Sequence, residues 1–162
     1  MLKKLFFFSL FVINIYANRL MKKELKFQNL NRHYFLNLPS KASTNKKPIL
    51  FVLHGGGGTA KRTAKIKSDF NLLSESDNFL IVYPQGVDKH WRDGRDFLKL
   101  WKYRHFAKNV DDVAFIKEIA KQLSKSNNGD LDNIFLTGIS NGAMMSYKVA
   151  CSELPLLLEL LL

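Results

Sequence analysis

Thr137-Gly138-Ile139-Ser140-Asn141-Gly142 places a serine between two glycines, where a strand-like run ends and a helix-compatible run begins. This Gly-x-Ser-x-Gly spacing is typical of a nucleophile elbow, a strained strand-to-helix turn that exposes the serine hydroxyl. Glycines are needed on both sides because Cβ atoms there would collide across so sharp a bend. Ser140 is therefore the candidate catalytic nucleophile. Glycines that merely punctuate a loop would leave the same pattern, and that alternative stays open here.

The residues on either side of this turn support the elbow. Residues 134–137 form a short apolar run, and residues 143–147 begin a run compatible with a helix. The backbone N–H of Asn141 would then lie at a helix start, where the partial positive charge favours an oxyanion. Asn141 is thus expected to be an oxyanion donor.

A second glycine-rich stretch, His54-Gly55-Gly56-Gly57-Gly58, follows the continuous apolar run 49–53, which is typical of a strand buried on both faces. Glycines at a strand end let the backbone approach a ligand, so we expect Gly55 and Gly56 to supply further N–H donors to an oxyanion. A phosphate-binding loop is disfavoured because the Gly-x-x-x-x-Gly-Lys-Ser/Thr pattern is absent. His54 is expected to shape this loop by local hydrogen bonds rather than act as a general base, and it is a candidate for the substrate pocket.

Strand patterns occupy much of the first half of the chain. Residues 22–27 and 32–38, separated by turn-forming residues 29–31, suit an antiparallel hairpin at a sheet edge. Polar residues 39–48 predict a surface loop. Residues 79–83 predict a second buried strand, which the following proline and glycine stop.

Two segments have a helical composition, residues 61–76 and residues 110–125. The first, in one or two pieces, is predicted to bury Phe70, Leu72 and Leu73. The second has the clearer amphipathic period.

The ends of the second helix are also marked in the sequence. Asp111 and Asp112 fall in its first turn, where acidic residues suit the helix dipole, so they are interpreted as helix-start residues rather than catalytic ones. Residues 127–129 are predicted to end the helix, and Ile134 to begin the strand that leads to the elbow.

A turn-rich segment, Trp91-Arg92-Asp93-Gly94-Arg95, follows the strand at 79–83. It lies beyond the carboxyl end of that strand, where ligands bind in open α/β sheets. Trp91 is predicted either to line the acyl or alcohol pocket or to pack the loop down. Residues 97–106 are interpreted as an irregular, partly exposed insertion with no assigned chemistry.

Composition limits the class of protein. With 162 residues the chain can bury one core, but it is short for an α/β enzyme domain, which commonly has about 200 residues or more. The net charge is +11, yet the basic residues are spread along the chain without a nucleic-acid motif, so we expect a basic surface and no nucleic-acid partner.

Cys151 is the only cysteine and has no internal disulfide partner; it is either a small buried residue or its partner lies outside this chain.

The N-terminus has the pattern of a signal peptide at residues 1–17. Two lysines precede an almost continuous apolar run at 5–15, and an alanine stands at the expected cleavage point. The run is short for a bilayer span, so cleavage and export are favoured over an uncleaved membrane anchor. The expected mature domain is 18–162, secreted to the periplasm or the extracellular medium.

With both glycine-rich loops in place, residues 32–155 resemble the α/β-hydrolase superfamily, and within it the secreted esterases of the polyhydroxybutyrate depolymerase and feruloyl esterase type. The resemblance rests on His54-Gly55-Gly56-Gly57, Tyr83-Pro84-Gln85-Gly86, Trp91 with Asp93-Gly94-Arg95, residues 110–115 and residues 138–147. It implies a mostly parallel sheet with an N-terminal antiparallel hairpin. It also implies Ser-His-Asp chemistry through an acyl-enzyme on Ser140, without metal or organic cofactor. The implied substrate is a polyester, a feruloylated polysaccharide or a short-chain ester.

The chain departs from that family after the elbow. The family order is serine, acid, histidine, but no aspartate and no histidine follows Ser140. The histidines are His33, His54, His90 and His105. Glu153 and Glu159 lie too close behind the elbow to come from later strands, and residues 154–162 are leucine-rich. We therefore expect the C-terminal part of the domain to be missing and this chain to be inactive or incomplete as an esterase. A serine peptidase or acyltransferase of the same fold, and a non-catalytic remnant or binding module, are the alternatives.

Overall fold

A six-stranded sheet organises the part of the chain that the computed structural model describes, which comprises residues 20–41, 43–66, 69–95, 110–152 and 158–160. The strands are β1 (Met21–Phe27), β2 (Leu30–Asn37), β3 (Lys47–Leu53), β4 (Leu80–Pro84), β5 (Gly129–Gly138) and β6 (Leu158–Leu160). Their order is β1-β2-β4-β3-β5-β6. β1, β2 and β4 pair antiparallel, whereas β4, β3, β5 and β6 pair parallel. The predicted mostly parallel sheet with an N-terminal antiparallel hairpin is confirmed.

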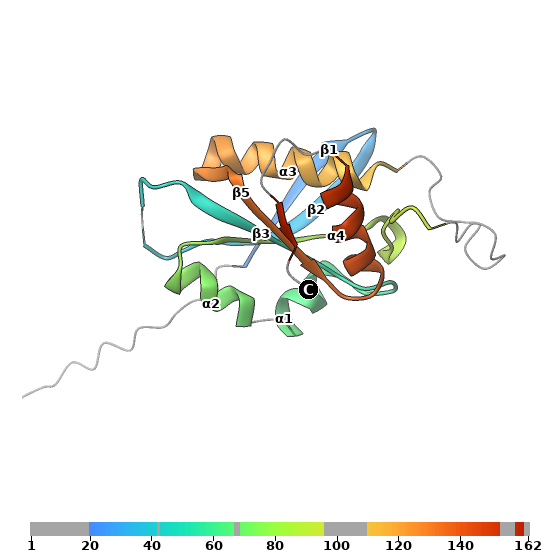
Figure 1. The fold of residues 1–162 in the computed structure, drawn as a ribbon, viewed down its shortest axis with the longest axis horizontal. Coiled ribbons are helices and arrows are strands. Elements are labelled where there is room, and N and C mark those ends of the chain that lie inside the picture. Colours follow the sequence, from blue (N-terminus) through green and yellow to red (C-terminus); the bar gives the residue numbers. More distant parts are fainter. Residues whose placement is uncertain (1–19, 42, 67–68, 96–109, 153–157, 161–162) are drawn as a thin grey trace, which may run out of the picture.

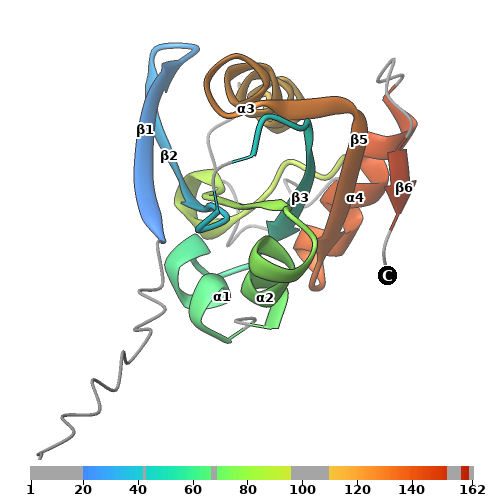
Figure 2. The same ribbon diagram turned by 90° about the vertical axis from the view of Figure 1, so that its left-hand side faces the viewer.

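Helices cover both faces of this sheet (Figures 1 and 2). They are α1 (Ala60–Ile66), α2 (Asp69–Ser76), α3 (Asp112–Asn127) and α4 (Asn141–Cys151), with a short 3-10 helix, η1 (Val87–Lys89). Alternate residues of β3 face opposite cores, as the twofold period of a strand requires. Phe51 packs in the core that contains residues of α3 and α4, and Val52 packs in the core that contains residues of α1. A continuous apolar run in β3 therefore fills both cores.

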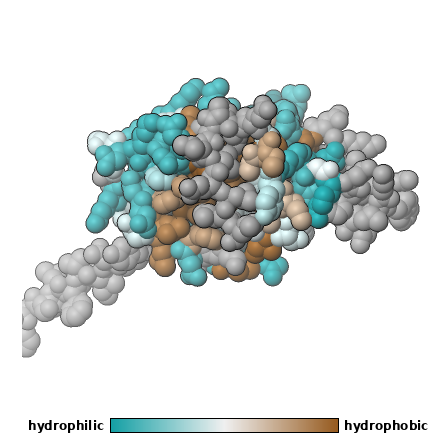
Figure 3. Space-filling view, viewed as in Figure 1, coloured by the Kyte–Doolittle hydropathy of each residue, from teal (hydrophilic) through white to brown (hydrophobic). Residues whose placement is uncertain are grey.

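The surface in the view of Figure 1 is divided by hydropathy. Figure 3 shows hydrophilic residues towards the top of this view, where α3 lies, and more hydrophobic residues towards the bottom, where α1 and α2 lie. Ile66 at the end of α1 and Leu72 in α2 are among the large hydrophobic residues that are exposed. No helix in the described ranges is long and apolar enough to cross a membrane.

Some element boundaries differ from the sequence-based expectation. The hairpin turns at Gln28 and Asn29, which both have positive φ (47° and 61°), as a tight two-residue turn requires. Asn31, expected in the turn, is instead in β2 and pairs with Lys26. β5 begins at Gly129 rather than at Ile134, because the chain passes from the left-handed Asn128 cap of α3 directly into the sheet.

The expected buried side of α2 is wrong at one position. Leu72 is 66% exposed, whereas Phe70 and Leu73 are partly buried against the core. The buried residues of this helix are Asn71 and Ser74, and the side-chain oxygen of Asn71 accepts a hydrogen bond from the Tyr83 hydroxyl at 2.9 Å. This bond turns Asn71 inward, and Leu72 faces solvent as a result.

Other expectations concern residues elsewhere in the chain. Cys151 is exposed, so its interpretation as a buried apolar residue is wrong. The signal peptide at 1–17 and the insertion at 97–106 lie outside the described residues.

Candidate active site

The turn between β5 and α4 has the strained geometry that the sequence predicts. Ser140 has φ 53° and ψ −116°, and the amide of Ile139 donates to the carbonyl of Leu53 at 3.3 Å. A Cβ on Gly138 would lie 2.6 Å from the backbone of Gly142, and a Cβ on Gly142 would lie 2.5 Å from the Leu53 carbonyl oxygen. Both glycines are therefore required sterically, and Ser140 occupies the apex of a closed turn.

The glycine-rich loop after β3 lies against this turn. A Cβ on Gly55 would be 3.9 Å from the Cβ of Ser140 and 3.3 Å from the carbonyl oxygen of Ile139. The amide of Gly57 donates to Lys89 at 2.8 Å, and the amide of Gly58 donates to Gly55 at 2.9 Å. The amides of Gly57 and Gly58 thus already have backbone acceptors within the protein.

His54 shapes this loop through its imidazole. The ring is 1% exposed; its Nδ1 bonds the Gly55 carbonyl at 2.8 Å, and its Nε2 accepts from the Gly86 amide at 3.0 Å. Because a carbonyl only accepts, the proton is on Nδ1, and burial lowers the pKa of the ring. His54 is therefore neutral and makes the local hydrogen bonds expected of it.

The hydrogen bond from His54 also helps to orient the peptide plane between Gly55 and Gly56. The Gly55 carbonyl receives both the His54 Nδ1–H and the Gly58 amide, so it is turned towards His54. In a trans peptide the carbonyl and the next N–H point in opposite directions. The N–H of Gly56 consequently points away from His54, as a donor held in place before any ligand binds.

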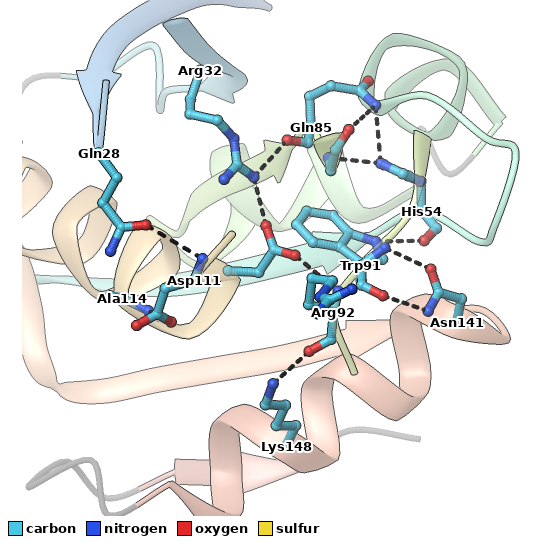
Figure 4. Close-up of polar contacts among 12 residues, drawn as sticks. Gln28, Arg32, His54, Gln85, Trp91, Arg92, Asp111, Ala114, Asn141 and Lys148 are labelled. Atoms are coloured by element: carbon cyan, nitrogen blue, oxygen red, sulfur yellow. Dashed lines mark hydrogen bonds and ion pairs between the residues drawn. The ribbon is translucent and has the colours of Figure 1, made fainter. Parts of the chain in front are cut away.

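Hydrogen bonds of Trp91 connect the loop after β4 to the elbow and to the glycine-rich loop (Figure 4). Its indole Nε1 donates to the His54 carbonyl at 2.8 Å, and its backbone amide donates to Asn141 Oδ1 at 2.8 Å. The Asn141 side-chain nitrogen donates in turn to the Trp91 carbonyl at 3.1 Å and to Asp93 Oδ2 at 2.7 Å. Trp91 is only 3% exposed and belongs to the core, which favours the packing alternative over the pocket alternative.

A buried ion pair beneath this loop was missed from the sequence. Arg32 of β2 donates to Asp112 Oδ1 at 2.7 Å and to the Gln85 carbonyl at 3.1 Å, while Asp112 Oδ2 accepts from the Arg92 amide at 2.9 Å (Figure 4). Its neighbour Asp111 is the helix cap that the sequence predicts, accepting from the Ala114 amide. Asp112 instead connects its own helix, α3, to strand β2 and to the loop after β4.

One signal for this pair was present in the sequence. Arg32 is separated by two residues from Tyr34 and by four from Leu36, so the twofold period of the strand puts it on the same buried face. An arginine in that position needs a buried partner. The partner itself, Asp112, could not be chosen from the local sequence.

Titratable side chains do not gather into a metal site in the described ranges. No group of three His, Cys, Asp or Glu side chains there is placed to hold an ion. The arrangement around Ser140 instead combines an exposed hydroxyl position with backbone N–H donors from two loops. That combination suits the stabilisation of an oxyanion during acyl transfer.

The mixed sheet, the elbow and the adjoining glycine loop are arranged as in the α/β-hydrolase fold. Solved structures share this fold: an acetyl xylan esterase from Aspergillus awamori superposes with a TM-score of 0.60 at 19% identity, covering 80% of this chain and 46% of that one. A thermostable esterase gives a TM-score of 0.61 at 20% identity, covering 85% and 38%.

Sequence comparison gives the family. The family model described as "Esterase PHB depolymerase" matches residues 32–156, and the chain belongs to this family. A probable feruloyl esterase C of Aspergillus clavatus is 30% identical over 127 residues, which cover 75% of this chain and 42% of that relative. An uncharacterized hydrolase of Acanthamoeba polyphaga mimivirus is 26% identical over 143 residues, covering 76% and 46%. The chain thus spans less than half the length of these relatives.

Proposed function

We propose that the whole protein is a carboxylic ester hydrolase that forms an acyl-enzyme on Ser140. The observation that carries the proposal is the strained Ser140 backbone at a strand-to-helix turn, with Gly55 packed against it. Relatives are described as a feruloyl esterase and as a bifunctional acetylxylan esterase/xylanase, which supports an ester as the substrate. A polyester, a feruloylated polysaccharide or a short-chain ester is the proposed class.

The proposed reaction has two acyl-transfer steps. The Ser140 hydroxyl oxygen attacks the ester carbonyl, and the alcohol leaves as the tetrahedral intermediate collapses to an acyl-serine. Water then attacks the acyl-serine and releases the acid. In both steps the negative oxygen would be held by the N–H groups of Asn141, Gly55 and Gly56. Loss of one such donor typically lowers kcat by about 10²- to 10³-fold.

The first attack also needs a base for the serine proton. His54 is unsuited because its Nε2 already accepts the Gly86 amide in a buried site. His33 is in β2, which is separated from β5 by β4 and β3. His90 lies next to Gly56, and His105 is outside the described residues. No histidine follows Ser140 in this sequence.

We therefore expect residues 18–162 by themselves to hydrolyse esters poorly. Removal of the base from a serine triad costs about 10⁶-fold in kcat and leaves about 10³- to 10⁴-fold over water. The measurement is p-nitrophenyl butyrate hydrolysis by this segment and by its Ser140→Ala variant. Robust turnover that Ser140→Ala abolishes would show that an upstream histidine acts as the base.

The nucleophile itself is tested by covalent labelling. In the full-length native protein, a fluorophosphonate probe should label Ser140, and Ser140→Ala should remove the label. Ser146→Ala is the matched control, since Ser146 is a buried serine of α4 whose hydroxyl bonds the Gly142 carbonyl. Undiminished labelling of Ser140→Ala would overturn the assignment.

Export is proposed for the same protein. The apolar run behind the two N-terminal lysines supports a signal peptide at 1–17. Mass spectrometry of the native protein should find an N-terminus close to Asn18. Recovery of the intact Met1 terminus from the cytoplasm would contradict export.

A further inference from the structure

The side chain of Asn141, the residue after the nucleophile, is held by three hydrogen bonds. Its Oδ1 accepts from the Trp91 amide at 2.8 Å, and its Nδ2 donates to the Trp91 carbonyl at 3.1 Å (Figure 4). The same Nδ2 donates to Asp93 Oδ2 at 2.7 Å. A side-chain amide has two N–H groups, so both are used. Because Asn141 is also buried, its side chain is kept in one orientation.

The backbone N–H of Asn141, one of the proposed oxyanion donors, belongs to the peptide that follows Ser140. Ser140 has φ 53° and ψ −116°, a combination that a residue with a Cβ seldom adopts. Such strain persists only where surrounding contacts hold it. Rotation about ψ of Ser140 changes the direction of the Asn141 N–H. The hydrogen bonds that fix the Asn141 side chain oppose that rotation.

Asp93 is itself oriented by the turn in which it lies. Its side chain is 1% exposed; Oδ1 accepts from the Arg95 amide at 3.0 Å, and Oδ2 accepts from the Arg95 guanidinium, from Nε at 2.9 Å and from Nη2 at 2.5 Å. Gly94 makes this turn possible, because its φ of 92° is one that glycine adopts readily. The carboxylate is thus presented to Asn141 in a fixed position.

The carboxylate of Asp93 keeps its negative charge at neutral pH. Burial by itself would raise its pKa, but the hydrogen bonds from Arg95 and Asn141 hold the pKa below the ordinary value. A hydrogen bond to an ionised acceptor is roughly twice as strong as one between neutral groups. Of the three bonds that hold the Asn141 side chain, the bond to Asp93 is the shortest and the one with a charged acceptor.

We propose that Asp93 is a positioning residue, which acts through the side chain of Asn141 to keep the Asn141 N–H directed at the oxyanion. Asp93 does this without touching the substrate. This inference rests on the proposed ester hydrolase function of Ser140.

The direction of the N–H can be measured by its residual dipolar coupling in weakly aligned, ¹⁵N-labelled full-length native protein. In Asp93→Ala the coupling of the Asn141 amide should change while the couplings of α3 amides stay as in the wild type. Asp93→Asn, whose amide oxygen can accept from Asn141, should keep a coupling closer to the wild-type value. Asp132→Ala removes an exposed carboxylate of β5 and should leave the coupling unchanged.

Kinetics with p-nitrophenyl butyrate give a second measurement. In Asp93→Ala, kcat should fall by about 10- to 100-fold with KM nearly unchanged, because a misplaced oxyanion donor weakens the transition state rather than substrate binding. Asp93→Asn keeps an acceptor for Asn141 but loses one for Arg95, so its kcat should fall by only about 3- to 10-fold. Asp132→Ala should match the wild type. Titration with the fluorophosphonate probe gives the concentration of folded sites, so a loss of folded protein is not counted as a loss of kcat.

The two proposals fail in different ways. An unchanged Asn141 coupling in Asp93→Ala, or a wild-type kcat per labelled site, overturns the role of Asp93 and leaves the ester hydrolase proposal standing. A change confined to KM overturns it as well. If Asp93→Ala does not fold, a wild-type kcat per site in Asp93→Asn overturns the role. Absence of wild-type turnover contradicts the ester hydrolase proposal alone, and the coupling then decides whether Asp93 fixes Asn141.

Discussion

The imidazole of His54 bonds two backbone segments at once, the Gly55 carbonyl and the Gly86 amide. The bond to the Gly86 amide needs the neutral ring, because Nε2 must accept it, whereas Nδ1–H can donate to the Gly55 carbonyl in either protonation state. A proton on Nε2 would face the Gly86 N–H, donor against donor, and the loop would lose the bond that joins it to the end of β4. The position of the glycine loop is therefore linked to the protonation of one buried side chain.

This linkage predicts a pH dependence of stability. Burial lowers the pKa of His54 in the folded protein, whereas the unfolded chain keeps a value near 6.5. The unfolded state then binds the proton more readily, so the stabilisation is complete above about pH 6.5 and is lost as pH falls through that value towards the folded pKa. We expect a lower free energy of unfolding in urea at pH 5.5 than at pH 7.5, with a smaller difference in His54→Gln.

The control for this prediction is His33→Gln. The pKa of His33 is also lowered, by burial and by the charge of Lys22, but its ring is only partly buried. His33→Gln should keep most of the pH dependence. Equal losses in the two variants would mean that His54 is not the main titrating group.

At the scale of elements, one face of α4 holds the loop after β4. Asn141 bonds Trp91 and Asp93, and Lys148, seven residues later on the same face, donates to the Arg92 carbonyl at 2.5 Å. The helix that begins at the elbow thus also positions the segment that contains His90. The loop after β4 and the elbow are thus joined by these side-chain hydrogen bonds.

Removal of the Asn141 side chain should loosen that connection. Asn141→Ala leaves the buried Trp91 amide without its acceptor, and such a loss costs about 1 to 3 kcal/mol. We expect hydrogen exchange at the Trp91 amide to become faster by about tenfold or more by NMR, since about 1.4 kcal/mol corresponds to tenfold. Ser146→Ala, on the same helix, should leave this amide unchanged. Unchanged exchange in Asn141→Ala would show that the loop is held by other contacts.

Elements that are buried on both sides were the ones that the sequence predicted well. The apolar runs at 49–53 and 79–83 became β3 and β4 because a strand in the middle of a parallel sheet has no solvent face. The first residues of β5 were missed since Asp130, Asp132 and Asn133 carry no apolar period, and in this part of the strand Gly129 pairs with Lys47 of β3 before an irregularity in the register.

The residues of the candidate site also fall into those that the sequence predicted and those that it did not. Ser140 and the glycine loop were found because local backbone geometry demands glycine at fixed positions. The partners of Trp91 and Arg32 are 50 and 80 residues away along the chain, so no local pattern could join them. Long-range contacts of this kind become known only when the fold is known, so the local sequence could not predict them.

For the molecule as a whole, the Arg32–Asp112 pair joins the hairpin, α3 and the loop that follows β4. Both side chains are at most 3% exposed, and the guanidinium lies 3.8 Å from the centroid of the Phe115 ring. Burying a charge in this way is costly unless an opposite charge lies beside it. The pair therefore fixes the relative placement of three parts of the fold rather than adding a surface contact.

Breaking this pair should be costly. Asp112→Ala leaves the Arg32 charge buried and uncompensated, and we expect the free energy of unfolding in urea to fall by about 3 to 5 kcal/mol. Lys46→Ala is the comparison, because Lys46 forms exposed ion pairs with Asp130 and Asp132 that contribute about 1 kcal/mol or less. A loss below about 1 kcal/mol in Asp112→Ala would show that the pair is compensated by water or other groups.

The strand order also determines when each part of the sheet can form during synthesis. Ile49 of β3 pairs with Leu80 on one side and with Ile134 on the other. At about 5–20 residues per second, Ile134 follows Leu80 out of the ribosome after roughly 3 to 11 s. For that interval one edge of a strand that is apolar from Ile49 to Leu53 has no neighbour, and it can pair with a second nascent chain. The yield of soluble protein is therefore expected to depend on how that edge is shielded during translation, and less on the stability of the finished domain.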